Sequence, residues 1–390
     1  MTGRRLLQLL LATVVIGAAA AGIAVAGAVH GNDTKFEYAI GVWGDMPYSD
    51  VQAQTGVPSL IDDMNSAQIE FSVHDGDLKA GNATPGSVTP TSCQNTTEPS
   101  IYSQGKGYLN SLRDPAIFTP GDNDWTDCDR TTNGGFNSLE RLQYERGVFF
   151  STNKSLGKRQ LTLEVQTDPL CQGTTSLTGQ PRFLTGCVEN RRWTFKKVTY
   201  ATLNVQGSCN NLCSSGAGDP GGDLDEYTAR EAANEQWLQD TFDEASDRHS
   251  AAVMIVWQAD PGFDTSGYQG AAKRDSRTLV QTDGNPDGYH DILSELRRLT
   301  IAFEKPVVLV HGDSHYFLID KPLLDSDGRR VENFTRVETF GDHQGISAAH
   351  PEWDTNAVHW VKVLVDPKSR DVFAFQPQIV PANRVAVPSP

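Results

Sequence analysis

Short apolar runs alternate with amphipathic segments along the first third of the chain. The runs Tyr38–Trp43, Glu70–His74 and Ala116–Thr119 are rich in β-favouring residues, and each leads into a Gly-Asp turn. Between them, Val57–Asn65 and Tyr102–Leu112 space their apolar residues with helical periodicity. The order strand, helix, strand, helix, strand predicts a parallel sheet of an α/β domain.

The remainder of the chain continues this alternation. Helices are expected at Leu139–Val148, Asp225–Asp247 and Ile292–Phe303, and strands around Thr194–Tyr200 and at Ala252–Trp257, Val307–Val310, Phe317–Ile319, Thr335–Phe340, Val358–Val365 and Val372–Gln376. The Gly- and Ser-rich segment Gly207–Asp223 is expected to be a loop. We expect the C-terminal strands to form a second sheet, which makes the fold class α/β, a two-sheet sandwich flanked by helices. Because no linker or repeat divides residues 35–380, they form one predicted domain.

The first 26 residues have the composition of an export signal. Arg4 and Arg5 precede a long apolar run that starts at Leu6, and the run ends in an Ala-Val-Ala triplet at residues 24–26. This pattern predicts a secreted or extracytoplasmic protein. The alternative is that the segment stays as a single N-terminal membrane anchor, because about 20 apolar residues are enough to span a bilayer.

Acidic residues outnumber basic ones, with 49 Asp and Glu against 33 Lys and Arg and a formal net charge of -16. Binding to a nucleic-acid backbone depends on Lys and Arg neutralising phosphate charge, and the sequence has no basic stripe. We therefore expect no nucleic-acid partner. An anionic small molecule remains compatible with this charge, because a bound cation can dominate the field of a pocket.

All six cysteines follow the N-terminal segment, at positions Cys93, Cys128, Cys171, Cys187, Cys209 and Cys213. An even number of cysteines in an exported chain favours disulfides. The simplest pairing joins neighbours, such as Cys171 with Cys187 and Cys209 with Cys213. The alternative of a zinc site is weaker, because the spacing contains no C-x-x-C pair and no flanking histidine cluster.

Five predicted strands end in loops with polar side chains. These loops are Gly44–Tyr48, Gly76–Asp77, Gly121–Trp125, Trp257–Asp260 and His311–His315. Open α/β sheets bind ligands at the carboxyl ends of their strands, so we expect the loops to face one crevice. Two hard cations bridged by a carboxylate need such a convergence of oxygen and imidazole ligands.

In order and spacing, the five loops resemble the motifs of the calcineurin-like metallophosphoesterases, D-x-H, G-D, G-N-H-D/E, H and G-H-x-H. The resemblance extends over about residues 38–318 and implies a metallophosphoesterase-like fold. It implies that Asp45 binds one metal ion and that Asp77 bridges two. It also implies metal-ligand positions at Asp122, Gln258, Asp313 and His315.

Two further positions of the resemblance bear on catalysis. Asn123 falls where the family has the histidine that contacts phosphate and assists the leaving group. Asp124 falls where the family has the acid that orients this histidine. His74, His311 and His359 lie outside the motif positions, and we interpret them as structural.

Several positions depart from the family pattern. Pro47 stands at the histidine of the first motif and cannot bind a metal, although the phenol of the adjacent Tyr48 is an alternative ligand. Gln258 and Asp313 also replace histidines, and Asp122 replaces an asparagine. The expected ligand set is therefore nearly all oxygen, which favours Mg, Mn, Ca or Fe over zinc in a site for two divalent metal ions.

These observations predict a metal-dependent phosphoric ester hydrolase that acts on a phosphate-ester small molecule outside the cytoplasm, with metal-bound water as nucleophile. The absence of histidine at position 123 removes the expected general acid, a group that typically contributes ~10²–10⁴-fold to the rate. The main alternative is therefore a catalytically degenerate binding or scaffold protein that retains the fold. A serine esterase built on Gly312-Asp313-Ser314 is a weaker alternative, because no D-x-x-H partner follows it.

Overall fold

The computed structural model describes residues 36–167, 186–214, 220–263, 274–341 and 357–384. The predicted signal segment, residues 1–26, lies outside them, as does Cys171. The chain from Phe36 onward forms one compact unit. In the part of the chain that the structure describes, no helix combines the length and the apolar character that crossing a bilayer requires.

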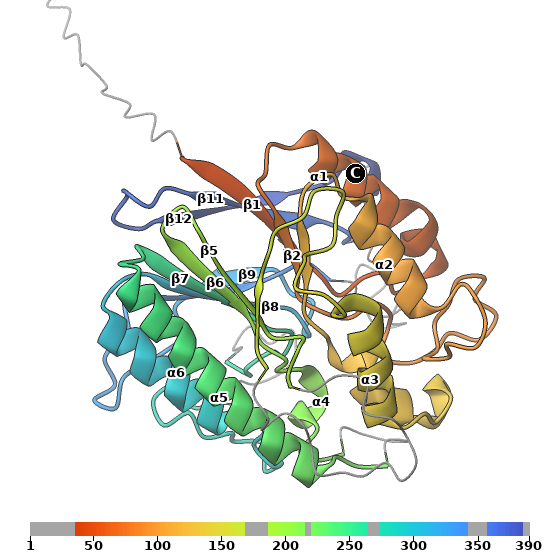
Figure 1. The fold of residues 1–390 in the computed structure, drawn as a ribbon. Helices are drawn as coiled ribbons and strands as arrows, with labels where there is room; N and C mark the ends of the chain where they lie inside the picture. The colour runs from red at the N-terminus through yellow and green to blue at the C-terminus, as the bar shows by residue number, and fades with distance from the viewer. Residues whose placement is uncertain (1–35, 168–185, 215–219, 264–273, 342–356, 385–390) are drawn as a thin grey trace, which may run out of the picture. The chain divides into compact units, whose positions relative to one another are not determined.

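Two mixed sheets form the centre of this unit (Figure 1). The first sheet has the order β12-β11-β1-β2-β3, and the second has the order β4-β5-β6-β7-β8-β10-β9. The strands are β1 (Tyr38–Trp43), β2 (Ser72–His74), β3 (Ala116–Phe118), β4 (Glu164–Val165), β5 (Arg191–Phe195), β6 (Val198–Thr202), β7 (Ala252–Val256), β8 (Val307–His311), β9 (Leu318–Asp320), β10 (Phe334–Glu338), β11 (Trp360–Val365) and β12 (Phe373–Gln378). As predicted, β1, β2 and β3 are parallel neighbours.

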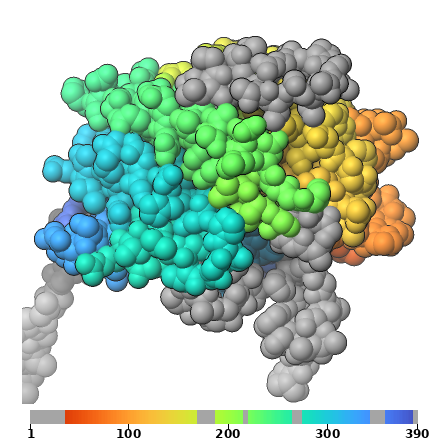
Figure 2. Space-filling view, turned by 90° about the horizontal axis from the view of Figure 1, so that it is seen from below, coloured from red at the N-terminus to blue at the C-terminus, as the bar shows by residue number. Residues whose placement is uncertain are grey.

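Helices flank the two sheets (Figure 1). They are α1 (Val57–Ser66), α2 (Ile101–Ser111), α3 (Ser138–Phe149), α4 (Gly207–Asn210), α5 (Leu224–Asp247) and α6 (His290–Phe303). Helices α5 and α6 pack together, with Phe242 and Phe303 in edge contact at 5.6 Å. Figure 2 shows their green and cyan surfaces side by side. The predicted α/β two-sheet sandwich flanked by helices is therefore confirmed.

The strands are hydrophobic on both faces because each sheet lies between two apolar layers. In β1, Ile40 and Val42 face the other sheet, whereas Trp43 packs under α1 and α2. In β7, Met254 faces the first sheet, whereas Ile255 packs under α5 and α6. Successive side chains of a strand point to opposite faces, so both kinds of position must be apolar. This explains the continuous apolar runs in the sequence.

One prediction about the strands is wrong. The last two strands do not join the other C-terminal strands in a second sheet; β11 pairs antiparallel with β1 and brings β12 with it. The free edge of β1 accepts them, so the second sheet combines β4 to β7 with β8, β10 and β9. The strand-like pattern around Thr194–Tyr200 corresponds to the hairpin of β5 and β6, in which Lys196 and Lys197 turn the chain with φ of +41° and +67°.

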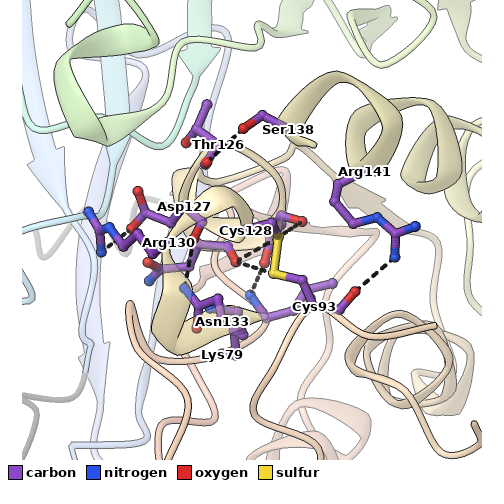
Figure 3. Close-up of a disulfide and its surroundings, with 12 residues drawn as sticks. Lys79, Cys93, Thr126, Asp127, Cys128, Arg130, Asn133, Ser138 and Arg141 are labelled. Carbon is purple, nitrogen blue, oxygen red and sulfur yellow. Dashed lines mark hydrogen bonds and ion pairs between the residues drawn. A yellow bond between two sulfur atoms is a disulfide. The ribbon is translucent and has the colours of Figure 1, made fainter. Parts of the chain in front are cut away.

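Two disulfides join described cysteines, and both lie close to the predicted motif loops. Cys209 pairs with Cys213 as predicted, and Cys93 pairs with Cys128. Figure 3 shows the bridge between Cys93 and Cys128, which ties the loop before α2 to the segment that follows the third motif loop. Arg141 of α3 donates a hydrogen bond of 2.8 Å to the carbonyl oxygen of Cys93 and holds the same junction.

A buried ion pair connects α3 to the second sheet. Arg146 donates two parallel hydrogen bonds to Glu189, at 2.8 and 2.7 Å, and Asn204 donates a third at 3.0 Å. Burial alone would raise the pKa of Glu189, but the charge and hydrogen bonds of Arg146 outweigh it, and the pKa is lowered. Glu189 is therefore a charged group whose burial depends on its partners.

We expect Arg146→Met to lower the free energy of unfolding by about 3–5 kcal/mol, because it leaves a buried carboxylate without its cation. Urea denaturation at pH 7 measures the change. The matched control is Arg298→Met, which breaks the exposed pair with Glu295 and should cost about 0–1 kcal/mol. An equal loss of unfolding free energy in the two variants would contradict the stabilising role of the buried pair between Arg146 and Glu189.

Candidate metal centre

The five loops converge at the carboxyl ends of the central strands of both sheets. The backbone nitrogen of Asp45, after β1, donates to the carbonyl oxygen of Gly76, after β2, at 3.0 Å. The backbone nitrogen of Asp313, after β8, in turn donates to the carboxylate of Asp45 at 3.1 Å. Residues that are far apart in the sequence thus meet at one point.

Asp45, Asp77 and His315 together could hold a metal ion. One ligand atom of each lies within 4.8 Å of the others. Both aspartates are buried, and Nε2 of His315 lies 3.6 Å from Oδ1 of Asp45. The three side chains come from three of the five predicted loops.

Asp122, Gln258 and Asp313 form the adjoining part of the site. The amide nitrogen of Gln258 lies 3.0 Å from Oδ1 of Asp122 and 3.3 Å from Oδ2 of Asp77. A Cβ atom built on Gly207 would lie 2.6 Å from Oδ1 of Asp313 and 2.7 Å from Oδ2 of Asp122. The two carboxylates therefore meet against the backbone of Gly207.

Tyr48 lies at the centre of this arrangement. Its hydroxyl donates to Oδ2 of Asp77 at 2.8 Å and lies 3.1 Å from Nε2 of His315. The ring of Tyr48 also meets that of His315 edge-on, with centroids 5.0 Å apart. Tyr48 therefore places its phenol oxygen between Asp77 and His315, whereas the side chain of Pro47 has no atom that can bind a metal ion.

Asn123 contacts the carboxylate of Asp77, whereas Asp124 accepts hydrogen bonds from backbone nitrogens. The amide nitrogen of Asn123 lies 2.6 Å from Oδ2 of Asp77 and 3.2 Å from the hydroxyl of Tyr48. The carboxylate of Asp124 accepts hydrogen bonds from the backbone nitrogens of Asp77, Leu78 and Gly121. Asp124 thereby holds the second and third loops together, and its catalytic assignment stays a prediction.

Four residues of the site have left-handed backbones. The values of φ are +52° at Asp45, +64° at Asp77, +74° at Asp313 and +66° at His315. Residues other than glycine seldom adopt this conformation, which costs on the order of 1–3 kcal/mol each. Such strain persists only where surrounding contacts impose it, and it concentrates at functional sites.

Two glycines allow the carboxylates to approach neighbouring loops. A Cβ atom at Gly121 would lie 2.0 Å from Oδ1 of Asp77, and one at Gly312 would lie 1.9 Å from Oδ2 of Asp45. No side chain fits at such distances. The glycines of the third and fifth loops are therefore required by the carboxylates of the second and first loops.

Burial and mutual repulsion raise the pKa values of three carboxyl groups in the site. The pKa of Asp45 is raised by burial and then by the charges of Asp75 and Asp313. The pKa of Asp77 is raised by burial and then by Asp122 and Asp45, and that of Asp313 by burial and then by Asp122. The protein's own groups thus leave negative charge at the site poorly compensated, and a cation would relieve it.

Ser208 also reaches the site, although no motif in the sequence includes it. Its hydroxyl lies 2.5 Å from Oδ2 of Asp122 and 2.7 Å from Oδ1 of Asp127, and it can donate a hydrogen to only one of them. Ser208 lies in the short helix α4, within the segment Gly207–Asp223 that the sequence pattern predicts to be a loop. Only the disulfide between Cys209 and Cys213, next to it in sequence, hinted at a fixed conformation.

No family model and no curated protein matches the chain. Among solved structures, PhoD shares 14% identity, with 85% of this chain and 64% of PhoD covered and a TM-score of 0.46. GAP50, the anchor in the inner membrane complex of Plasmodium, shares 10% identity over 88% of this chain and 89% of its own, with a TM-score of 0.37. A 5′-nucleotidase from Candida albicans shares 10% identity, with 87% of this chain and 50% of the nucleotidase covered and a TM-score of 0.39.

The chain thus spans less than two thirds of PhoD and half of the nucleotidase. At these identities the likeness concerns the fold.

We expect Gly312→Ala to weaken Mn²⁺ binding at least tenfold, because the new methyl group must displace the Asp45 carboxylate; loss of groups that support metal ligands typically costs ~10–100-fold. Isothermal titration calorimetry measures the affinity. The control is Gly147→Ala on the exposed face of α3, where an added Cβ meets nothing within 4 Å. That variant should bind like the wild type, and a similar loss in both would refute the steric explanation.

Proposed function

We propose that this protein is a metal-dependent phosphoric ester hydrolase that acts outside the cytoplasm on a phosphate-ester small molecule. The observation that carries the proposal is the convergence of Asp45, Asp77 and His315 within 4.8 Å at the ends of buried strands. Asp122, Asp313 and Gln258 extend this group, so the full set offers ligands for two divalent ions.

The residues present fit hard divalent cations. Carboxylate and phenol oxygens make up nearly all of the donors, and His315 adds one imidazole. Such a set suits Mg²⁺, Mn²⁺, Ca²⁺ or Fe²⁺ better than zinc. The raised pKa values of Asp45, Asp77 and Asp313 follow from burial and repulsion that bound cations would offset.

Bound divalent ions would neutralise phosphoryl charge and lower the pKa of a water molecule toward neutrality. The chain itself fixes the geometry around them. Tyr48 and Asn123 both donate to Oδ2 of Asp77 and so fix the direction of this carboxylate, which would face the bound ions. Because position 123 offers an amide instead of an imidazole, the leaving group receives no proton from there, and we expect a modest rate.

The location outside the cytoplasm rests on the signal-like N-terminal sequence and on the disulfides. Structural disulfides persist in oxidising compartments and are rare in the cytosol. The bridges Cys93–Cys128 and Cys209–Cys213 both support loops of the site. Whether the N-terminal segment is removed or retained as a membrane anchor does not alter the chemistry.

A specific set of contacts favours a second candidate, a catalytically degenerate binding or scaffold protein. Tyr48, Asn123 and Gln258 all lie within hydrogen-bonding distance of Oδ2 of Asp77. Such donors satisfy a buried carboxylate without a metal ion. The two candidates differ in their need for a cation, which can be measured directly.

We expect the purified protein to contain about two divalent ions per chain by elemental analysis, and to hydrolyse an aryl phosphate in a reaction that a chelator abolishes. Asp77→Asn should bind metal ions most weakly, because one carboxylate serves both ions. Its turnover should fall by ~10²-fold or more, in line with the several kcal/mol that a metal ion supplies to the transition state.

The matched control is Asp327→Asn, an exposed aspartate with no place in the site. It should retain metal content and turnover. A protein that binds no divalent ions and shows no chelator-sensitive hydrolysis would favour the scaffold candidate instead.

A further inference from the structure

The end of β10 and the residues after it form a wall of the site that none of the five motif loops supplies. The wall comprises Glu338, Thr339, Phe340 and Gly341, and its polar contacts reach Ser314 in the fifth motif loop and two residues adjacent to motif loops, Tyr316 and Asp75. The backbone nitrogen of Thr339 also donates to the carbonyl oxygen of His311 at 2.9 Å, which fixes this segment to the end of β8.

Glu338 holds both neighbours of His315. Its Oε1 atom accepts a hydrogen bond from the hydroxyl of Ser314 at 2.5 Å and one from the backbone nitrogen of Tyr316 at 2.8 Å. The side chain of Glu338 is fully buried. One oxygen atom therefore clamps the chain immediately before and immediately after the imidazole.

Gly341 and Thr339, two other residues of the wall, also contact residues in and next to the site. A Cβ atom at Gly341 would lie 2.7 Å from Cβ of Asp45 and 2.9 Å from Cδ2 of His315, so its backbone packs directly against both. The hydroxyl of Thr339 donates to Oδ2 of Asp75 at 2.7 Å. The imidazole is thus bounded by the wall on one side and by Tyr48 on the other.

We propose that Glu338 is a positioning residue that sets the direction of the His315 imidazole toward the metal centre. The inference rests on the proposed function, in which His315 is a metal ligand. His315 has φ of +66°, a conformation that needs support from its surroundings. The two hydrogen bonds to Glu338 supply that support, and groups that orient metal ligands in this way strongly affect metal affinity.

The test uses the Mn²⁺-loaded full-length protein and pulsed electron paramagnetic resonance. In the wild type we expect a ¹⁴N coupling from the imidazole, and His315→Ala should abolish it. Glu338→Ala removes the acceptor of both hydrogen bonds, so the coupling should fall by at least half. Its Mn²⁺ affinity should weaken about tenfold, within the ~10–100-fold range for such supporting groups.

Glu338→Gln retains an oxygen that accepts both hydrogen bonds, so it should restore the wild-type coupling. The matched control is Thr335→Val, which changes the same strand at the contact with Lys321 and should leave the coupling intact. If Glu338→Ala does not fold, Ser314→Ala decides: it removes one of the two bonds and should reduce the coupling.

The outcomes separate the two proposals. A wild type that binds no Mn²⁺, or binds it with no ¹⁴N coupling, overturns the ligand role of His315 and this inference with it. A wild-type coupling that survives unchanged in Glu338→Ala, or in Ser314→Ala where that variant decides, overturns the positioning role alone. Loss of the coupling in Glu338→Gln as well would also overturn the role of the accepting oxygen.

Discussion

The crowding of buried carboxylates at the ends of the two sheets is the constraint on which the rest of the structure depends. Asp45, Asp77, Asp122 and Asp313 come from four loops and repel one another, and the first three of them are buried. Burial of unpaired charge is costly. The fold therefore has to fix these groups from outside, and a bound cation would compensate the repulsion between them.

Hydrogen bonds, close glycine contacts and a disulfide fix the positions of these carboxylates. Asp124 ties two loops through their backbone nitrogens, and Gly121 and Gly312 leave room for the carboxylates of neighbouring loops. The disulfide between Cys93 and Cys128 secures the region behind the third loop. These contacts explain how several strained left-handed residues can persist together.

The sequence predicted those features that depend on local pattern. Buried parallel strands have continuous apolar runs in the sequence, and a glycine followed by an aspartate marks four of the five loops, so the loops and their convergence could be inferred. Long-range pairing could not be inferred. Nothing local indicates that β11 returns to β1, that Ser208 reaches Asp122, or that Glu338 clamps the chain around His315.

The substituted positions have a common physical character. Tyr48, Asn123 and Gln258 stand at or beside positions where the resembling family has histidines, and each lies within hydrogen-bonding distance of Asp77. They can support a carboxylate that bridges cations, or they can satisfy that carboxylate alone. The difference between an enzyme and a scaffold thus reduces to whether a cation occupies the space between these groups.

Anomalous X-ray scattering from crystals grown with Mn²⁺ tests this most directly. The account predicts a manganese peak between Asp45, Asp77 and His315, at ligand distances of about 2.0–2.6 Å, typical of hard divalent cations. Diffraction data at high Mn²⁺ concentration that show no anomalous peak there, with Tyr48 and Asn123 still bonded to Asp77, would contradict it.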